Sequence, residues 1–211
     1  LNMKYVDHVI TVNDSIAQYL TTDFKLLNYP LVLRNIPEKA HLHVENKDLL
    51  RKKFNINTST SILVFIGANI YANTLNLEQV IAELGNNPSY ALVFITAKNL
   101  NSKPIEELVM KKGYSNIFFH DLIPPSKIAM YLSCADVGLV PTWNKKDLSY
   151  WFALDNKLFE YINSGIPILA TEQPEYKSIV EGYGCGICVN PDISNAYLDG
   201  LDTIINNYES F

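Results

Sequence analysis

The chain has 211 residues, 48% hydrophobic and 18% charged, which is ordinary for a soluble globular protein and enough for one domain, or one domain with part of another. Its apolar runs, such as residues 62–66, are far shorter than the roughly 18 residues that indicate a membrane span. The net charge of −5 argues against a protein that wraps nucleic acid, because such binding needs a basic surface.

The opening of the chain alternates short extended and helical patterns. Residues 7–12 predict a strand, and the cluster Asn13-Asp14-Ser15 is typical of a helix start before residues 16–20. A second short strand is predicted at 31–33, and the run Arg34 to Pro37 ends regular structure after it.

From residue 49 onward, helical and strand patterns alternate, which predicts an α/β domain with a parallel sheet covered on both faces. The helix predicted at 75–84 carries an apolar stripe made by Leu77, Val80, Ile81 and Leu84. Strands are predicted at 62–66, 91–95, 117–119, 137–140, 166–170 and 186–189, and further helices at 49–54, 105–111, 127–134, 176–181 and 195–208.

One more helix is predicted between Asp155, as its N-cap, and Gly165, as its C-cap, with Pro167 preventing its continuation. Its first turn offers free backbone N–H groups and a partial positive charge, to which Asn156 and Lys157 add side-chain donors for a phosphate group. Glu160 lies one turn further and is suited to accept hydrogen bonds from two sugar hydroxyls.

An exposed ion pair between Lys157 and Glu160, worth about 0.2–0.5 kcal/mol, is the alternative interpretation of the same residues. Ligands of parallel sheets bind outside the carboxyl ends of the strands. We therefore expect the segments 67–69, 120–123 and 141–143 to meet the start of this helix at one edge of the sheet.

Three cysteines, Cys134, Cys185 and Cys188, are too few for a disulfide scaffold. Cys185 and Cys188 have the C-x-x-C spacing, but they run into an apolar strand instead of a helix start, and there is no second pair for zinc. A redox or metal role is the weaker interpretation. His41 and His43 are interpreted as linker residues because no acidic or Cys partner lies nearby in the sequence.

The run Asn156-Lys157-Leu158-Phe159-Glu160-Tyr161, followed by Ser164-Gly165-Ile166-Pro167-Ile168, resembles the donor-site helix of retaining glycosyltransferases of family 4, which have the GT-B fold. The resemblance implies a Rossmann-like, doubly wound parallel sheet that forms the C-terminal half of such an enzyme. Residues 1–36 would then be the end of the N-terminal acceptor domain with the interdomain linker, and residues 37–211 the donor-binding domain.

The resemblance also implies the donor-site residues. The backbone at Gly67 would approach the ligand, with Asn69 and Asn73 as neutral donors, and Ile123 would offer its N–H and C=O to the base. Asn156, Lys157 and Leu158 would hold phosphate and Glu160 the ribose. The family's usual Arg and Lys in the glycine loop are replaced by Ala68 and by Asn73-Thr74.

A second departure concerns the acidic pair spaced eight residues apart that many family members carry. Phe152 stands where the first carboxylate would be, and Asp155 stands where a Pro is frequent; this carboxylate either caps the helix or partly cancels its field. The aromatic run 150–152 either faces a sugar or packs against the core or the other domain. Asp136 is expected to be a structural hydrogen-bonding residue.

The expected activity is retaining, metal-independent transfer of a sugar from a nucleotide diphosphate sugar, without a cofactor, to a cell-envelope polysaccharide or lipid-linked glycan. The catalytic groups would lie in the missing N-terminal domain, so the chain alone would bind nucleotide without turnover. The expected location is the cytoplasm, with peripheral contact at the inner face of the membrane. A nucleotide-sugar epimerase of the same fold and a non-catalytic nucleotide-binding module are the alternatives.

Overall fold

The computed structural model describes residues 6–39, 48–70 and 75–211. The strands are β1 (Ile10–Thr11), β2 (Leu31–Val32), β3 (Ser61–Ile66), β4 (Tyr90–Ile95), β5 (Ile117–His120), β6 (Val137–Val140), β7 (Ile168–Thr171) and β8 (Gly186–Val189). The α-helices are α1 (Asp14–Asp23), α2 (Leu49–Phe54), α3 (Leu77–Leu84), α4 (Lys103–Lys112), α5 (Ile128–Leu132), α6 (Leu148–Trp151), α7 (Asn156–Asn163), α8 (Pro174–Val180) and α9 (Ala196–Asn206). The 3₁₀ turn η3 (Pro125–Lys127) precedes α5, and the 3₁₀ turn η4 (Tyr208–Ser210) follows α9.

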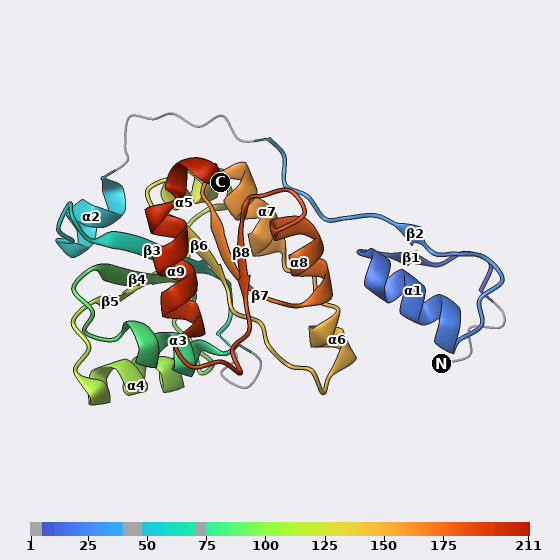
Figure 1. Cartoon of the computed structure of the whole chain (residues 1–211), viewed down its shortest axis with the longest axis horizontal. Coiled ribbons are helices and arrows are strands. Elements are labelled where there is room, and N and C mark those ends of the chain that lie inside the picture. The colour runs from blue at the N-terminus through green and yellow to red at the C-terminus, as the bar shows by residue number, and fades with distance from the viewer. Residues whose placement is uncertain (1–5, 40–47, 71–74) are drawn as a thin grey trace.

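Six strands form one sheet in the order β5-β4-β3-β6-β7-β8, and every neighbouring pair is parallel. Alternate residues of each strand face opposite sides of a sheet. On one side the strands pack against α3, α4 and α9, and on the other against α2, α5, α7 and α8 (Figure 1). The predicted fold class, a doubly wound α/β domain, is confirmed, and the apolar stripe of the helix at 77–84 is buried as expected.

A separate two-stranded parallel sheet, β1 with β2, forms with α1 an N-terminal segment, residues 6–36, that lies beside α6 and α8 (Figure 1). Asn13, which is fully buried, caps α1 by accepting from Ile16 N at 2.8 Å and donates its own amide to the Phe152 carbonyl at 2.6 Å. The carboxylate of Glu175, in the first turn of α8, accepts from Ser15 N at 2.7 Å. The predicted helix start at 13–15 is therefore confirmed, and it is also the contact with the main domain.

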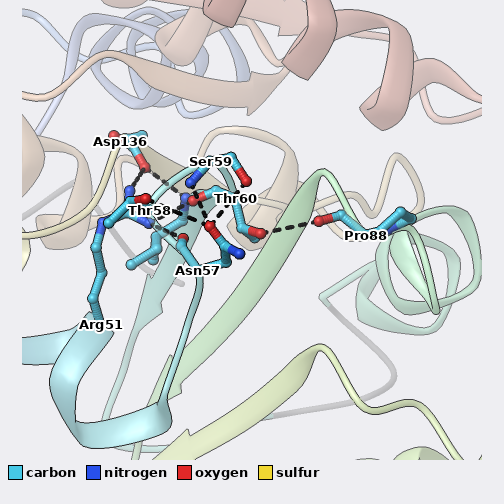
Figure 2. A network of polar contacts seen from close by, with 8 residues as sticks. Arg51, Asn57, Thr58, Ser59, Thr60, Pro88 and Asp136 are labelled. Carbon is cyan, nitrogen blue, oxygen red and sulfur yellow. Dashed lines mark hydrogen bonds and ion pairs between the residues drawn. The ribbon is translucent and has the colours of Figure 1, made fainter.

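Asp136 has the structural role expected of it. Its Oδ2 atom accepts from the Ile62 N–H at 2.6 Å and from the Arg51 guanidinium at 3.0 Å, and Arg51 also donates to the carbonyls of Asn57 and Thr60. Figure 2 shows this network where the loop before β3 meets the residue that precedes β6. It joins the amino ends of the two central strands, on the edge of the sheet opposite to the expected ligand edge.

The structure differs from the sequence expectations at a few places. The short helix α6 was not expected, and the helix expected at 127–134 is a 3₁₀ turn followed by one turn and a half of α-helix. Helix α7 ends with Ser164 as its C-cap, and Gly165 occupies the next position at φ +67°. The Gly165 N–H bonds to Ile162 O and the Ile166 N–H to Tyr161 O, which is the Schellman arrangement that requires a left-handed residue at Gly165.

Candidate functional site

The two central strands β3 and β6 separate at the carboxyl edge of the sheet. They share only the pairs Leu63–Val137 and Val64–Gly138, whereas β3 and β4 share six. The order of connections reverses between β3 and β6, and in open α/β sheets ligands bind where this reversal occurs. The expected edge, with Gly67 after β3 and Thr142 after β6, lies at this switch point.

Tyr161 of α7 fills the place where β3 and β6 stop pairing. Its hydroxyl accepts from the Ile66 N–H at 3.1 Å and lies 3.2 Å from the carbonyl oxygens of both Val64 and Leu139. A Cβ atom at Gly138 would come within 2.3 Å of the Tyr161 ring, so a glycine is needed beneath it. These contacts fix α7, and with it the helix start at Asn156, against the switch point.

The carboxylate of Asp155 does not cap α7, which corrects one sequence expectation. The residue has the extended backbone of an N-cap, but its Oδ2 atom accepts from Thr142 Oγ1 at 2.7 Å and from Lys157 Nζ at 2.8 Å. Burial raises the pKa of the Asp155 carboxyl, but the Lys157 ammonium and the hydrogen bonds outweigh it, so this pKa is lowered overall. Asp155 is therefore an anion that compensates the charge of Lys157.

Lys157 points its ammonium toward the sheet, where it lies 5.2 Å from the centre of the Phe65 ring on β3. Only 13% of its side chain is exposed. The ion pair with Glu160 that the alternative interpretation offered is not formed; the partner of Lys157 is Asp155. Lys157 is thus a largely buried cation at the switch point, already paired with one carboxylate.

The first turn of α7 retains donor groups at this edge. Asn156 is exposed, and the backbone N–H groups of Asn156 and Lys157 have no hydrogen-bond partner within the described residues. Leu158 differs from the expectation, because its side chain is buried and its N–H already bonds to the Asp155 carbonyl at 3.1 Å. The open N–H groups are therefore those of the two residues before it.

Glu160 is half-buried, and its carboxylate makes no hydrogen bond or ion pair within the described part of the chain. Burial raises the pKa of this carboxyl. A partly desolvated carboxylate without a partner is a strong hydrogen-bond acceptor for an incoming hydroxyl group. Its position on α7 therefore remains compatible with the expected contact to a sugar.

The loop after β3 contains Gly67 and Asn69, two of the residues that were expected to face the ligand. Gly67 does not have a left-handed φ, and a Cβ there would lie 3.2 Å from the Phe65 ring. The Asn69 side-chain oxygen accepts from the amides of Asn99 and Asn101 at 3.0 and 3.2 Å, which leaves its own amide group as a donor. Asn73 lies outside the described residues.

The loop after β5 presents the backbone of Ile123, whose N–H and C=O have no hydrogen-bond partner among the described residues. The preceding His120 is buried, with Nδ1 2.6 Å from the Asp121 carbonyl and Nε2 3.0 Å from Lys53 Nζ. Since a Lys ammonium only donates, the imidazole accepts at Nε2 and donates from Nδ1. His120 therefore holds the start of the loop in place.

The aromatic run 150–152 divides between two environments. Phe152 contacts the N-terminal segment, with its ring 6.0 Å from that of Tyr19. Trp151 packs edge-on against Trp143 at 5.6 Å, and Lys145 lies 4.4 Å over the Trp143 ring while pairing with Asp192 at 2.9 Å. The packing interpretation therefore holds for Phe152, whereas the two tryptophans stand at the carboxyl edge.

Thr142 lies in the segment 141–143 that was expected at this edge, whereas Phe65 and Tyr161 were not expected as neighbours of the site. Thr142 is fixed by Thr171 Oγ1 and Gln173 Nε2, which donate to its carbonyl at 2.5 and 2.7 Å. Its place directly after a predicted strand was the one available signal.

Within the described residues, no group of three or more His, Cys, Asp or Glu side chains could hold a metal ion, and no helix is long and apolar enough to cross a membrane.

The strand order defines a doubly wound α/β domain, and polar groups gather at its switch point, where ligands of such sheets bind. A family model described as glycosyl transferases group 1 matches residues 60–207, so the chain belongs to this family. No curated protein matches the chain.

Solved structures share the fold at low sequence identity. Sucrose-phosphate synthase from Thermosynechococcus elongatus superposes with a TM-score of 0.74 at 19% identity, over 97% of this chain and 50% of that one. Alr3699/HepE from Anabaena, solved in complex with UDP, gives 0.76 at 12% identity, over 96% of this chain and 55% of that one. The C-terminal domain of a glycosyl transferase group 1 family protein from Francisella tularensis gives 0.58 at 18% identity, over 83% and 90% of the two chains. The chain thus spans about half the length of the first two proteins.

Proposed function

We propose that the chain is the donor-binding half of a GT-B glycosyltransferase that transfers a sugar from a nucleotide diphosphate sugar with retention of configuration and without a metal ion. The observation that carries the proposal is the juxtaposition on α7 of Lys157, the open N–H groups before Leu158 and the unpartnered Glu160, all at the switch point of the sheet. Such groups match a diphosphate followed by a ribose.

The rest of the edge supplies a place for each further part of the donor. The free backbone groups of Ile123 would take the edge of the base, and Gly67 and Asn69 would line the diphosphate from the other side of the switch point. Asn73, outside the described residues, is proposed as a further donor to the diphosphate. The family membership and the UDP complex of Alr3699/HepE support a nucleotide as ligand. Glu160 would orient the donor, and the groups that act on the reacting sugar would come from the other half.

The N-terminal segment supports the division at residue 36 into the end of a preceding domain and a donor domain of residues 37–211. A parallel sheet is normally covered on both faces, yet Ile10 and Leu31 of the β1–β2 pair are 63% and 58% exposed, and Leu33, directly after β2, is 54% exposed. These residues would be covered by further strands and helices of an acceptor-binding domain. Its acceptor would be a cell-envelope polysaccharide or a lipid-linked glycan, met in the cytoplasm at the membrane face.

The first test is isothermal titration calorimetry of the chain with UDP, GDP and ADP. We expect one of them to bind, and we expect no transferase turnover by the chain alone, because the acceptor site lies in the other half. Absence of heat with all three diphosphates would contradict the proposal and favour a non-catalytic module. Turnover by the isolated chain would contradict the assignment of donor binding to this chain and of acceptor binding to the other half.

The second test assigns Glu160. Glu160→Gln should weaken the bound nucleoside diphosphate by roughly tenfold to a hundredfold, the range for a hydrogen bond to a charged group. The 2′,3′-dideoxy form of the same nucleotide lacks both hydroxyls, so the variant and the wild type should bind it equally. Glu181→Gln, an exposed carboxylate just after α8, is the matched control and should change neither affinity. An equal loss with both nucleotides would contradict the ribose contact.

A further inference from the structure

Asp155 is an unusual residue for a phosphate-binding helix start, because it brings a negative charge to the position where an anion should bind. Its side chain is 25% exposed, and its Oδ2 atom accepts both from Lys157 Nζ and from Thr142 Oγ1. Thr142 is in turn 2% exposed and held through its carbonyl by Thr171 and Gln173. The carboxylate is therefore fixed by the frame of the sheet.

This fixation has two electrostatic effects on α7. It keeps the carboxylate from capping the helix, so the first N–H groups stay open, although an Asp at the N-cap normally accepts from them. It also cancels most of the charge of Lys157, the only cation that lies against the ring of Phe65 within the described residues. A diphosphate that binds at this helix start must share Lys157 with Asp155.

We propose that Asp155 sets the affinity of the site so that the nucleoside diphosphate product is released more readily than the nucleotide-sugar donor is. This inference rests on the proposed function and deepens it. A terminal phosphate carries close to two negative charges above its second pKa of about 6, so a free nucleoside diphosphate has about one more negative charge than its sugar ester. A fixed carboxylate repels the more highly charged ligand more strongly.

The negative charge of Asp155 therefore distinguishes the donor from the product. It lowers the affinity of the site for both ligands, but it lowers the affinity for the product more. A helix start without such a counter-charge would hold the product tightly after sugar transfer, and release would then limit turnover.

The test compares UDP with UDP-glucose, and ADP with ADP-glucose, by calorimetry at pH 8 in wild type and Asp155→Asn. Asn keeps an oxygen that can accept from Thr142 and Lys157 but removes the charge. We expect Asp155→Asn to tighten the free diphosphate by roughly threefold to tenfold, which lies within the effect of one charge at a partly buried helix terminus, and the sugar ester by a smaller factor, about twofold to fivefold. Glu181→Gln, which removes the same charge from an exposed ion pair with Lys177, should shift neither.

Each outcome has a defined meaning. If wild type and variant bind none of the four ligands, both the proposed function and this inference fall. If wild type binds but Asp155→Asn does not tighten the free diphosphate, or tightens the sugar ester by as large a factor, the inference alone is wrong, and Asp155 only positions Lys157. Should Asp155→Asn not fold, Asp155→Pro also removes the charge, at a backbone of φ −67° and ψ 132° that proline adopts. It removes the acceptor of Thr142 and Lys157 as well, so the readout is then the ratio of the two ligands: a larger gain for the free diphosphate than for the sugar ester supports the inference, and an equal change contradicts it.

Discussion

Removal of the Tyr161 hydroxyl should destabilise the domain at the junction of its two central strands. Tyr161→Phe leaves the Ile66 N–H without its acceptor and removes the hydroxyl that lies between the carbonyl oxygens of Val64 and Leu139. Tyr161 is fully buried, so water does not replace these bonds. Each unsatisfied buried group costs about 1–3 kcal/mol, but a hydroxyl donates only one hydrogen at a time, so we expect a loss of about 2–4 kcal/mol in the free energy of unfolding.

For a domain of this size that loss corresponds to a decrease in Tm of roughly 4–16 °C. Urea denaturation followed by circular dichroism and calorimetric melting measure it, with Tyr183→Phe as the matched control because that tyrosine is 78% exposed. Gly138→Ala should be similarly damaging, since its new Cβ would lie 2.3 Å from the Tyr161 ring. A change below about 0.5 kcal/mol in Tyr161→Phe, no larger than that of an ordinary surface substitution, would refute the role given to the hydroxyl.

Three further predictions concern other groups. Asp136→Ala should lower the free energy of unfolding by about 2–4 kcal/mol, measured by urea denaturation, because it leaves the Ile62 N–H without its acceptor and the Arg51 guanidinium without its carboxylate partner; an unchanged midpoint would contradict this. Burial raises the pKa of the Glu160 carboxyl in the folded state above its value in the unfolded chain. The stability that this difference contributes is fully present below the unfolded pKa, where the carboxyl is protonated, and it is lost as the pH rises through the folded pKa. Glu160→Gln should therefore melt at a higher temperature than the wild type at pH 7 but not at pH 3, and the reverse order would refute the assignment. Burial raises the pKa of the Cys188 thiol to about 12, so native Cys188 should react with iodoacetamide at pH 8 far more slowly than in urea, as peptide mass spectrometry would measure; equal rates would contradict the burial.

Most of the fold was predictable because the signals for it are local. The apolar runs 62–66 and 91–95 are long enough to identify buried strands, and their alternation with helical stripes leaves a parallel sheet as the consistent arrangement. The helix α6 was missed because four residues carry too little periodicity to distinguish a helical turn from a loop. The C-cap of α7 was displaced by one residue because Gly165 marks the left-handed position, which follows the cap.

The site was less predictable, because its side chains have partners distant in sequence. Asp155 has the residue type of an N-cap, but its carboxylate accepts a hydrogen bond from Thr142, thirteen residues away, instead of from the helix N–H groups. Lys157 and Glu160 have the spacing of an ion pair on a helix surface, but the Lys157 ammonium pairs with Asp155 instead. Such outcomes depend on where β6 ends relative to α7, which no local pattern specifies. The roles of Gly67, Asn69 and Ile123 in ligand binding stay predictions.

The glycine at 138 and the tyrosine at 161 each restrict which residues can replace the other in evolution. Any larger residue at 138 requires the ring at 161 to be absent, and without that ring the two central strands lose the group that joins them beyond their last pair. A larger residue at 138 alone therefore clashes with the ring, and loss of the ring at 161 alone removes the group that joins the strands. Across divergent relatives with this helix, the two positions should be inherited as a unit.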